Sequence, residues 1–361
     1  MNAAPPLPPI DPPLVTAALP GIGGHLRVRL EDFEVEEVPA YEPGGDGEHV
    51  WVWIEKRDLT TPLAAARLAA AAGVPERDVG WAGMKDRRAV TRQWLSLPHG
   101  AGPAMAALET LDDGGLRVLR VTRHKNKLKT GHLAGNRFAL VVRGVDGDAA
   151  TAADRARAVL AALAPGAPNW YAEQRFGRDG DNAERGLELI RARGKGPGAP
   201  RQRRFLVSAF QSYLFNRWLV DRLTDGLLAD VLVGDLLQKR GSGGMFFSTD
   251  PAVDRERLVA GELVVTGPMF GAAMRSPPDG SPAHAREATL LAGLSLGPAD
   301  FHPLRAIAEG ARRHATVLVG NPTAEPLVED DGPAVRVSFT LPPGAYATAI
   351  LREIQKTYTE D

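Results

Sequence analysis

The sequence predicts an α+β fold in which a sheet-based domain carries a more helical insertion. Segments with the alternating apolar pattern of β-strands cluster between residues 26 and 145, and one more stands alone at 334–341. The longest helical pattern, RRFLVSAFQSYLFNRWLVDRL, lies between them. We therefore expect one domain formed by residues 21–165 and 321–361, with residues 166–320 inserted into it.

Each element has its own local signal. HLRVRLEDFEVEEVP alternates apolar and polar residues, and VWVWI, WLSL, LRVLRV, RFALVVR and VRVSFTL are short strands rich in β-branched and aromatic residues. Thr61 and Pro62 are suited to begin a helix, and Gly73 to end it. Helices and strands are thus both present, as the fold class requires.

Composition limits the class of protein. A chain of 361 residues with 44% hydrophobic and 24% charged residues is long enough for two globular domains. It has no cysteine, which excludes disulfides, thiol nucleophiles and zinc–thiolate sites. Residues 1–20 are rich in proline and are expected to form a flexible tail without the features of a secretory signal. Since no long apolar run is present, we expect no membrane span and a cytoplasmic protein.

Signals for cofactors and metals are weak. The glycine clusters GIGGH and GSGGM lack the spacing of a phosphate-binding loop, so both are interpreted as turns. None of the 8 histidines forms a pair at helical ligand spacing, and no Gly-x-Ser-x-Gly motif occurs. We therefore expect no cofactor and no metal, and chemistry carried by carboxylate, amine, hydroxyl and aromatic groups.

Basic residues are concentrated in two stretches although the net charge is only −1. Residues 114–145 and 189–220 contain no Asp or Glu but many Lys and Arg. Such stretches are typical of a surface that follows nucleic-acid phosphates, although two solvated faces would have the same composition.

The segment GWAGMKDRRAV, residues 80–90, places the single acid Asp86 beside Lys85, Arg87 and Arg88. An ordinary surface loop could have this composition. A carboxylate that must stay ionised near a polyanion would also need cations around it.

Five motifs in order along the chain resemble those of the tRNA pseudouridine synthase D family. They are EDFEVEE, AGMKDRRAVTRQW, HKNKLKTGHLAGNRF, NWYAEQRFG and LPPGAYATAILRE, and the similarity extends from about residue 20 to 355. The resemblance implies a pseudouridine synthase fold with a mixed, mainly antiparallel sheet and an inserted, family-specific (TRUD) α/β domain.

The resemblance also implies a reaction and a substrate. It implies a tRNA pseudouridine(13) synthase, an isomerase that converts uridine 13 in the D arm to pseudouridine, with Asp86 as the catalytic nucleophile. The carboxylate could attack the ribose or the base, or assist loss of the base. An RNA-binding, tRNA-modifying protein without a membrane or metal partner follows, and a monomer is favoured.

Further site residues follow from the same resemblance. Phe33, Phe138 and Tyr346 are expected around the target base, with Asn136 bonded to the base or ribose. Arg27 is expected beside Asp86, and Lys85 near the substrate. Lys125, Lys127 and Lys129 are expected to contact RNA phosphates.

Two other functions stay open at this point. A catalytically silent RNA-binding protein would keep the basic stretches but not need the Asp86 motif. A carboxylate-dependent hydrolase of a small nucleoside would use Asp86 but would not need the basic stretches.

Overall fold

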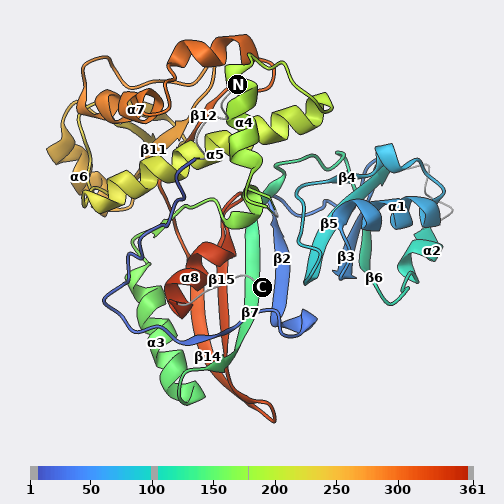
Figure 1. The fold of residues 1–361 in the computed structure, drawn as a ribbon. Helices are drawn as coiled ribbons and strands as arrows, with labels where there is room; N and C mark the ends of the chain where they lie inside the picture. The colour runs from blue at the N-terminus through green and yellow to red at the C-terminus, as the bar shows by residue number, and fades with distance from the viewer. Residues whose placement is uncertain (1–6, 99–104, 178, 357–361) are drawn as a thin grey trace. The chain divides into compact units, whose positions relative to one another are not determined.

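The computed structural model describes residues 7–98, 105–177 and 179–356 of the chain (Figure 1). It divides into two compact units. We call the first the sheet unit, which comprises Ala18–Ala164, Leu318–Ala347 and Leu351–Asp361, and the second the insertion unit, which comprises Met1–Ala17, Pro165–Val317 and Thr348–Ile350. Each unit is described by itself.

The sheet unit is built on a mixed sheet that has nine strands among the described residues. Its main path runs in the order β14 (Gly320–Glu329), β15 (Gly332–Leu341), β7 (Leu133–Val145), β2 (Phe33–Pro39), β5 (Val90–Pro98), β3 (His49–Arg57) and β6 (Leu116–His124). Two short strands complete it: β1 (Gly23–His25) pairs with β7, and β4 (Gly80–Trp81) pairs with β5. The β2–β5 pair is parallel and the other pairs are antiparallel, so the predicted mixed, mainly antiparallel sheet is confirmed.

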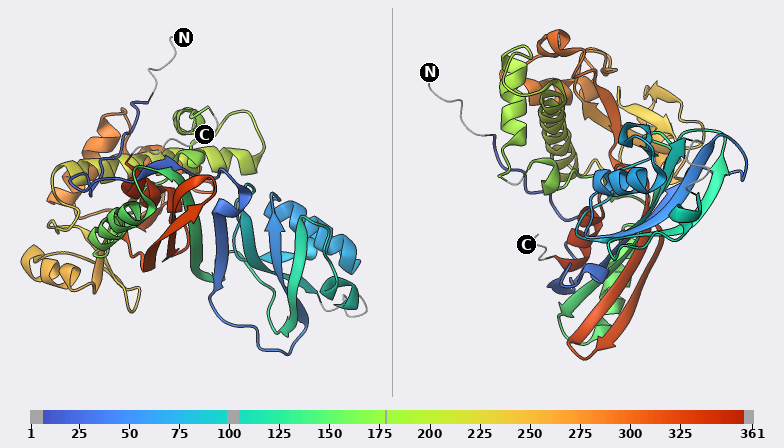
Figure 2. Two further views of the ribbon diagram at one scale, coloured as in Figure 1. Left: turned by 90° about the horizontal axis from the view of Figure 1, so that it is seen from below. Right: turned by 90° about the vertical axis from the view of Figure 1, so that its right-hand side faces the viewer.

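Helices pack against the strands of the sheet unit. The helix α1 (Thr61–Ala72) has Thr60 as N-cap and ends at Gly73, whose φ of 66° favours glycine. Its buried alanines and Leu68 pack with Val50, Val52 and Ile54 of β3. The helix α3 (Ala149–Ala162) lies along β14 and β15, as Figures 1 and 2 show, and α2 (Met105–Glu109) is a further helix of this unit. The helix α8 (Ala347–Gln355) is divided, since Thr348–Ile350 belong to the insertion unit and its other residues to the sheet unit.

The insertion unit combines helices with antiparallel strands. The helix α5 (Pro200–Thr224) covers the long helical pattern seen in the sequence, and α4 (Asn182–Arg191), α6 (Pro251–Val259) and α7 (Pro282–Ala292) accompany it. Its sheet has the order β10 (Met245–Phe247), β9 (Leu236–Lys239), β11 (Leu263–Met269), β12 (Ala311–His314). The short strands β8 (Ala167–Pro168) and β13 (Thr316–Val317) pair where the insertion begins and ends. None of the helices among the described residues is both long and apolar enough to span a membrane.

The proline-rich N-terminal segment is attached to the insertion unit. The backbone N–H of Leu7 donates to Glu184, and the Tyr213 hydroxyl donates to the carbonyl of Pro8 at 2.9 Å. Leu7 and Ile10 pack against the core cluster of α4 and α5. These contacts differ from the flexible tail expected over residues 1–20, since residues 7 and beyond have apolar and hydrogen-bonding partners; residues 1–6 lie outside the described part of the chain.

Candidate active site

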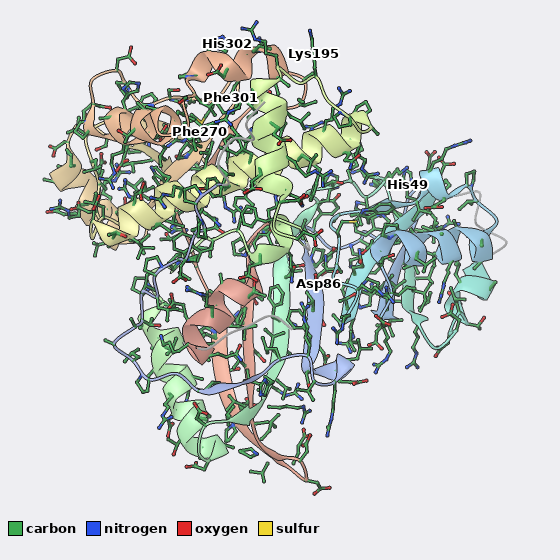
Figure 3. All side chains as sticks on the ribbon, in the orientation of Figure 1. His49, Asp86, Lys195, Phe270, Phe301 and His302 are labelled. Atoms are coloured by element: carbon green, nitrogen blue, oxygen red, sulfur yellow. The ribbon has the colours of Figure 1, made fainter. Side chains whose placement is uncertain are left out.

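Asp86 lies on the loop between β4 and β5 (Figure 3). Its side chain is 42% exposed, and one carboxylate oxygen lies 3.5 Å from Nη2 of Arg27. The cations next to it in sequence have other positions: Arg87 pairs with Asp58 at 3.2 Å, and Lys85 is buried elsewhere. An exposed carboxylate with one cation beside it stays available to react, and the partly exposed ion pair orients the acid more than it stabilises the fold.

Arg27 has a left-handed backbone conformation, which residues other than glycine rarely adopt. Its φ is 56°, and its guanidinium lies over the ring of Phe33, 4.1 Å from the centroid. This cation–π contact fixes the planar guanidinium beside the carboxylate of Asp86. Left-handed backbone at a non-glycine residue is costly and is concentrated at functional sites. The strand position that the sequence suggested for Arg27 is therefore a strained turn between β1 and β2.

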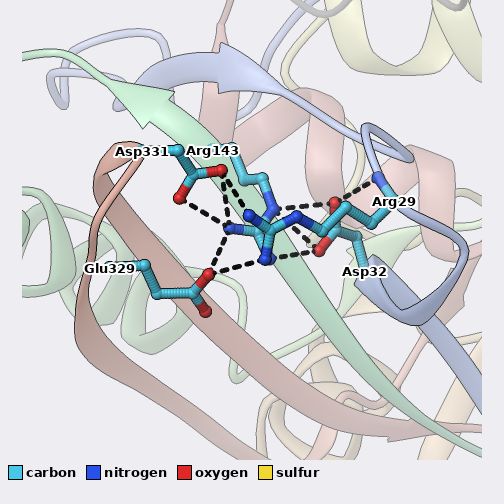
Figure 4. A network of polar contacts seen from close by, with 5 residues as sticks. All are labelled: Arg29, Asp32, Arg143, Glu329 and Asp331. Carbon is cyan, nitrogen blue, oxygen red and sulfur yellow. Dashed lines mark hydrogen bonds and ion pairs between the residues drawn. The ribbon is translucent and has the colours of Figure 1, made fainter.

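An ionic network with a buried Asp32–Arg143 pair at its centre anchors that turn (Figure 4). Asp32 is fully buried and accepts two hydrogen bonds from Nε of Arg143, at 2.8 and 2.9 Å, and one from the backbone N–H of Arg29. Glu329 and Asp331, at the β14–β15 turn, bind the guanidinium groups of Arg29 and Arg143. The two guanidinium groups lower the pKa of Glu329. The network fixes the segment that carries Arg27 and Phe33.

The strand register gathers the remaining predicted pocket residues on one face of the sheet. Phe138 of β7 lies opposite Val35 of β2, and Asn136 lies opposite Glu37. Phe33 and Phe138 are buried, so the sheet core holds most of both rings. The oxygen Oδ1 of Asn136 is also buried, and among the described residues nothing donates a hydrogen bond to it. A buried acceptor without a donor is costly, so Asn136 is a candidate to bind a ligand.

Tyr346 lies at the start of α8, in the segment that follows β15. It is half-buried, and it belongs to the same unit as Asp86. The strand β15, which precedes it in the chain, ends at Leu341, and Leu341 pairs with Asn136.

Lys85 is placed differently from what the sequence suggested. Its ammonium donates to Glu37 at 2.8 Å, and both side chains are almost fully buried. The second oxygen of Glu37 accepts from the backbone N–H of Trp94. Burial raises the pKa of Glu37, whereas Lys85 opposes that shift. Lys85 therefore ties the Asp86 loop to β2, in place of the expected substrate contact.

Hydrogen bonds to the first turn of α1 complete the support of the loop. The Thr61 hydroxyl accepts from the backbone N–H of Lys85 and donates to Gln93 at 2.9 Å. The amide of Gln93 in turn donates to the carbonyl of Gly83. Both side chains are fully buried. Gln93 thus links the first turn of α1 to the segment that leads to Asp86.

The sequence motifs do not predict a role for Lys56. It lies in β3, is fully buried, and donates from Nζ to the backbone carbonyl of Asp86 at 2.6 Å. The motif VWVWIEKR gives one signal that could have found it, because Lys56 occupies the alternation of the buried residues Val50, Val52 and Ile54. A lysine in such a position needs a partner in the folded protein.

The three lysines expected to meet phosphates lie between β6 and β7. Lys125 and Lys129 are exposed, and Lys125 is paired loosely with Asp46 at 3.4 Å. Lys127 is half-buried, and its Nζ lies 3.5 Å from the carbonyl of Arg77. Buried Leu128 anchors the segment, and a Cβ on Gly80 would lie 2.3 Å from its carbonyl oxygen, so only glycine fits there.

This lysine segment is also tied to the loop that carries Asp86. The backbone N–H of Gly131 donates to the carbonyl of Ala82 at 2.9 Å. The N–H of Leu128 donates to the hydroxyl of Ser96 on β5. The lysine segment and the Asp86 loop are thus joined through backbone hydrogen bonds.

A basic hollow of about 600 Å³ opens beside the Asp86 loop. Four of its seven lining residues are arginines: Arg27, Arg29, Arg87 and Arg88. Such a concentration of guanidinium groups suits a phosphate backbone. No cluster of three or more His, Asp or Glu side chains that could hold a metal ion occurs in the described part of the chain.

Comparison with known proteins gives the family of the chain. The family model for tRNA pseudouridine synthase D (TruD) matches residues 10–195 and 199–354. The chain belongs to the tRNA pseudouridine synthase D family. The resemblance inferred from the five motifs is therefore confirmed. Pseudouridine synthases are isomerases, which gives the reaction class.

Curated relatives agree over nearly their full length. The tRNA pseudouridine synthase D of Anaeromyxobacter dehalogenans is 48% identical over 356 residues, with 97% of this chain and 98% of that protein covered. The enzyme of the same name from Thermus thermophilus is 44% identical over 350 residues, with 97% of this chain and 93% of that protein covered.

A solved structure supports the fold. The crystal structure of a candidate tRNA pseudouridine synthase D from Methanosarcina mazei superimposes with a TM-score of 0.73 and covers 96% of each chain. Its sequence identity is 22%, so this comparison bears on the fold alone. The predicted α+β fold of a pseudouridine synthase is confirmed.

Proposed function

We propose that this protein isomerises uridine 13 in the D arm of tRNA to pseudouridine, with Asp86 as the nucleophile. The observation that carries the proposal is the half-exposed Asp86 carboxylate beside Arg27, next to a hollow lined by arginines. Family membership supplies the reaction class. The same membership supports tRNA as the macromolecule that the basic hollow receives.

The reaction needs one reactive carboxylate and a bound, unstacked base. The bond between C1′ and N1 breaks, the uracil turns, and a bond between C1′ and C5 forms, while C5 loses its proton and N1 takes one up. Substrate and product are isomers, so no oxidant, reductant or energy source is consumed. Asp86 acts as the nucleophile, and Arg27, 3.5 Å away, orients its carboxylate.

Recognition of the uridine falls to the face of the sheet around Asn136. A base inside folded tRNA must leave its stack before a protein carboxylate can reach it. We assign Asn136 to accept from the uracil N3–H or a ribose hydroxyl, and its buried Oδ1, which has no donor in the described structure, supports this role. Half-buried Tyr346 offers aromatic surface to the base, as aromatic side chains do for unpaired nucleotides, and the buried rings of Phe33 and Phe138 support that region from the sheet core.

Phosphate contacts would then place the tRNA on the protein. Lys125, Lys127 and Lys129 lie on a segment that is hydrogen-bonded to the Asp86 loop, and the arginine-lined hollow lies on the loop's other flank. A small nucleoside would not need these cations, which disfavours the nucleoside hydrolase. The Asp86–Arg27 pair disfavours the silent RNA-binding protein, since binding alone does not need a reactive acid.

Substrate exchange tests the proposed target. The purified protein is incubated with unmodified tRNA carrying uridine 13, with the same tRNA carrying cytidine 13, and with free uridine. We expect pseudouridine at position 13 of the first RNA only. Pseudouridine at other positions in the cytidine 13 tRNA would contradict the assigned position. Release of uracil from free uridine would support the hydrolase instead.

A further inference from the structure

We propose that Lys56 is a positioning residue for this reaction: its buried ammonium holds the Asp86 peptide and so sets where the carboxylate meets the uridine. The inference rests on the proposed function and adds a residue to it. Lys56 does not touch the substrate face itself, because its side chain is fully buried beneath the loop. It acts through Asp86.

The geometry around Lys56 is specific. Its Nζ donates to the carbonyl oxygen of Asp86 at 2.6 Å, a short and charge-assisted hydrogen bond. The carboxylate of the same residue is held from the other side by Arg27 at 3.5 Å. Asp86 is therefore held by two contacts, a hydrogen bond to its backbone carbonyl and an ion pair with its carboxylate. A loop held in this way keeps its reactive group in one place.

Burial of this ammonium does not serve the stability of the fold. No carboxylate forms an ion pair with Nζ of Lys56 anywhere in the structure as described, whereas Lys85, close by, has Glu37. Burial lowers the pKa of Lys56 to about 8, against the attraction of the Asp86 carboxylate and with the repulsion of Lys85. An apolar side chain of similar length would be at least as stable in this position. The cost of the buried charge is explained if the charge orients Asp86.

The side chains around Lys56 leave Asp86 as its main charged partner. Its cross-strand neighbours are Thr91 of β5 and Leu116 of β6, neither of which is ionisable in this range. The hydroxyl oxygen of Thr91 is buried and, among residues that the structure describes, has no hydrogen-bond partner.

Other ionisable groups near Lys56 are already paired. Lys85 is bound by Glu37, and Arg27 is paired with the Asp86 carboxylate. In the strand of Lys56 itself, Arg57 is bound to Glu31 and Glu55 to Arg92. On the flanking elements, Arg87 is paired with Asp58, and Arg67 of α1 with Asp113.

Substitution by methionine, which has a similar shape and no charge, tests the role. We expect Lys56→Met to lower kcat on tRNA by about 10- to 100-fold, since small displacements of a reacting group cost that much. The KM and the Kd for tRNA should stay within about threefold of wild type, and the thermal unfolding midpoint should not fall. Lys239→Met, an exposed lysine of β9, is the matched control and should match wild type in all four values.

The pH profile of kcat gives a second readout that a merely structural role would not move. Because the protonated ammonium makes the contact, wild-type kcat should fall as the pH rises through about 8. The uridine itself loses a proton in alkaline solution, so the informative quantity is the difference between two profiles. Lys56→Met should lack the limb near pH 8 that wild type and Lys239→Met share.

Failure of this inference can be told apart from failure of the proposed function. If wild type makes no pseudouridine, the proposed function is wrong. If wild type is active and Lys56→Met has the same kcat, Lys56 does not position Asp86. A variant that loses stability and tRNA binding together, yet keeps the alkaline limb, would also overturn the positioning role.

Discussion

The orientation of the Asp86 carboxylate depends on the geometry of one arginine, Arg27. Arg27 combines a left-handed backbone, an ion pair at 3.5 Å and a ring contact at 4.1 Å, and each of these restricts its guanidinium. A lysine could supply the charge but not the planar group that lies over Phe33. The chemistry at this residue is therefore sensitive to shape as well as to charge.

Arg27→Lys tests that sensitivity. We expect kcat to fall by about tenfold in Arg27→Lys and by about 100-fold in Arg27→Ala, since the first keeps the charge and the second removes it. Single-turnover rates with saturating tRNA measure the change. The exposed Arg255→Lys in the insertion unit serves as control. Equal rates for wild type, Arg27→Lys and Arg27→Ala would show that Arg27 has no role in the reaction.

Lys127 represents the expected phosphate contacts. Lys127→Ala should weaken tRNA binding and lower the slope of log K against log salt concentration by about 0.7 to 0.9, the value for one phosphate contact. Lys125→Ala should act in the same direction. The rate at saturating tRNA should stay unchanged, because neither side chain contacts Asp86. Binding titrations at several salt concentrations give the slope, and an unaltered slope would remove these lysines from the interface.

Among the elements, the loop between β4 and β5 is the one that needs most support. It is held to β2 by the Lys85–Glu37 pair, to α1 by Thr61, and to β3 by Lys56. These contacts come from three elements distant in sequence. The loop itself has few apolar residues, so buried polar contacts fix its path.

The Lys85–Glu37 pair carries a prediction about stability. Removal of one partner leaves a buried charge alone, so Glu37→Leu should lower the free energy of unfolding by about 3 to 5 kcal/mol. The double variant Glu37→Leu, Lys85→Met should recover at least half of that loss, because no charge is left without a partner. Denaturant titrations of the four proteins in the cycle measure it. If the double variant loses as much unfolding free energy as Glu37→Leu and Lys85→Met lose together, the two residues do not act as a pair.

The elements show what the sequence could and could not predict. Alternation and capping located β2, β3, β7, β15 and α1, because these signals are local. The motif around Asp86 and the family resemblance predict which loop carries the reactive acid, and that role stays a prediction. The contacts of Lys85 and Lys56 were not predictable, since both depend on which strand the loop crosses. The sequence predicts a substrate contact for Lys85, whereas in the fold Lys85 is bound to Glu37 and anchors the loop.

The stability of the whole molecule in alkaline solution should carry the signature of Lys56. Its folded pKa of about 8 lies below the ordinary lysine value of 10.5, so folding disfavours the protonated form. The penalty is fully present below pH 8 and is relieved as the pH rises from 8 towards 10.5. The free energy of unfolding of wild type relative to Lys56→Met should therefore rise by up to about 3 kcal/mol over this range. Denaturant titrations at pH 7 and pH 10 measure it; a constant difference would contradict the lowered pKa.

We propose that the activity of the whole protein depends on Asp86 as the reactive group on tRNA. The most direct test maps pseudouridine at single-nucleotide resolution in unmodified tRNA after incubation with wild type or with Asp86→Asn. We predict pseudouridine at position 13 with wild type and none with Asp86→Asn, while both bind tRNA with Kd values within about threefold, since the substitution keeps the size of the side chain. Pseudouridine formed by Asp86→Asn at the wild-type rate, or none formed by wild type, would contradict the role of Asp86.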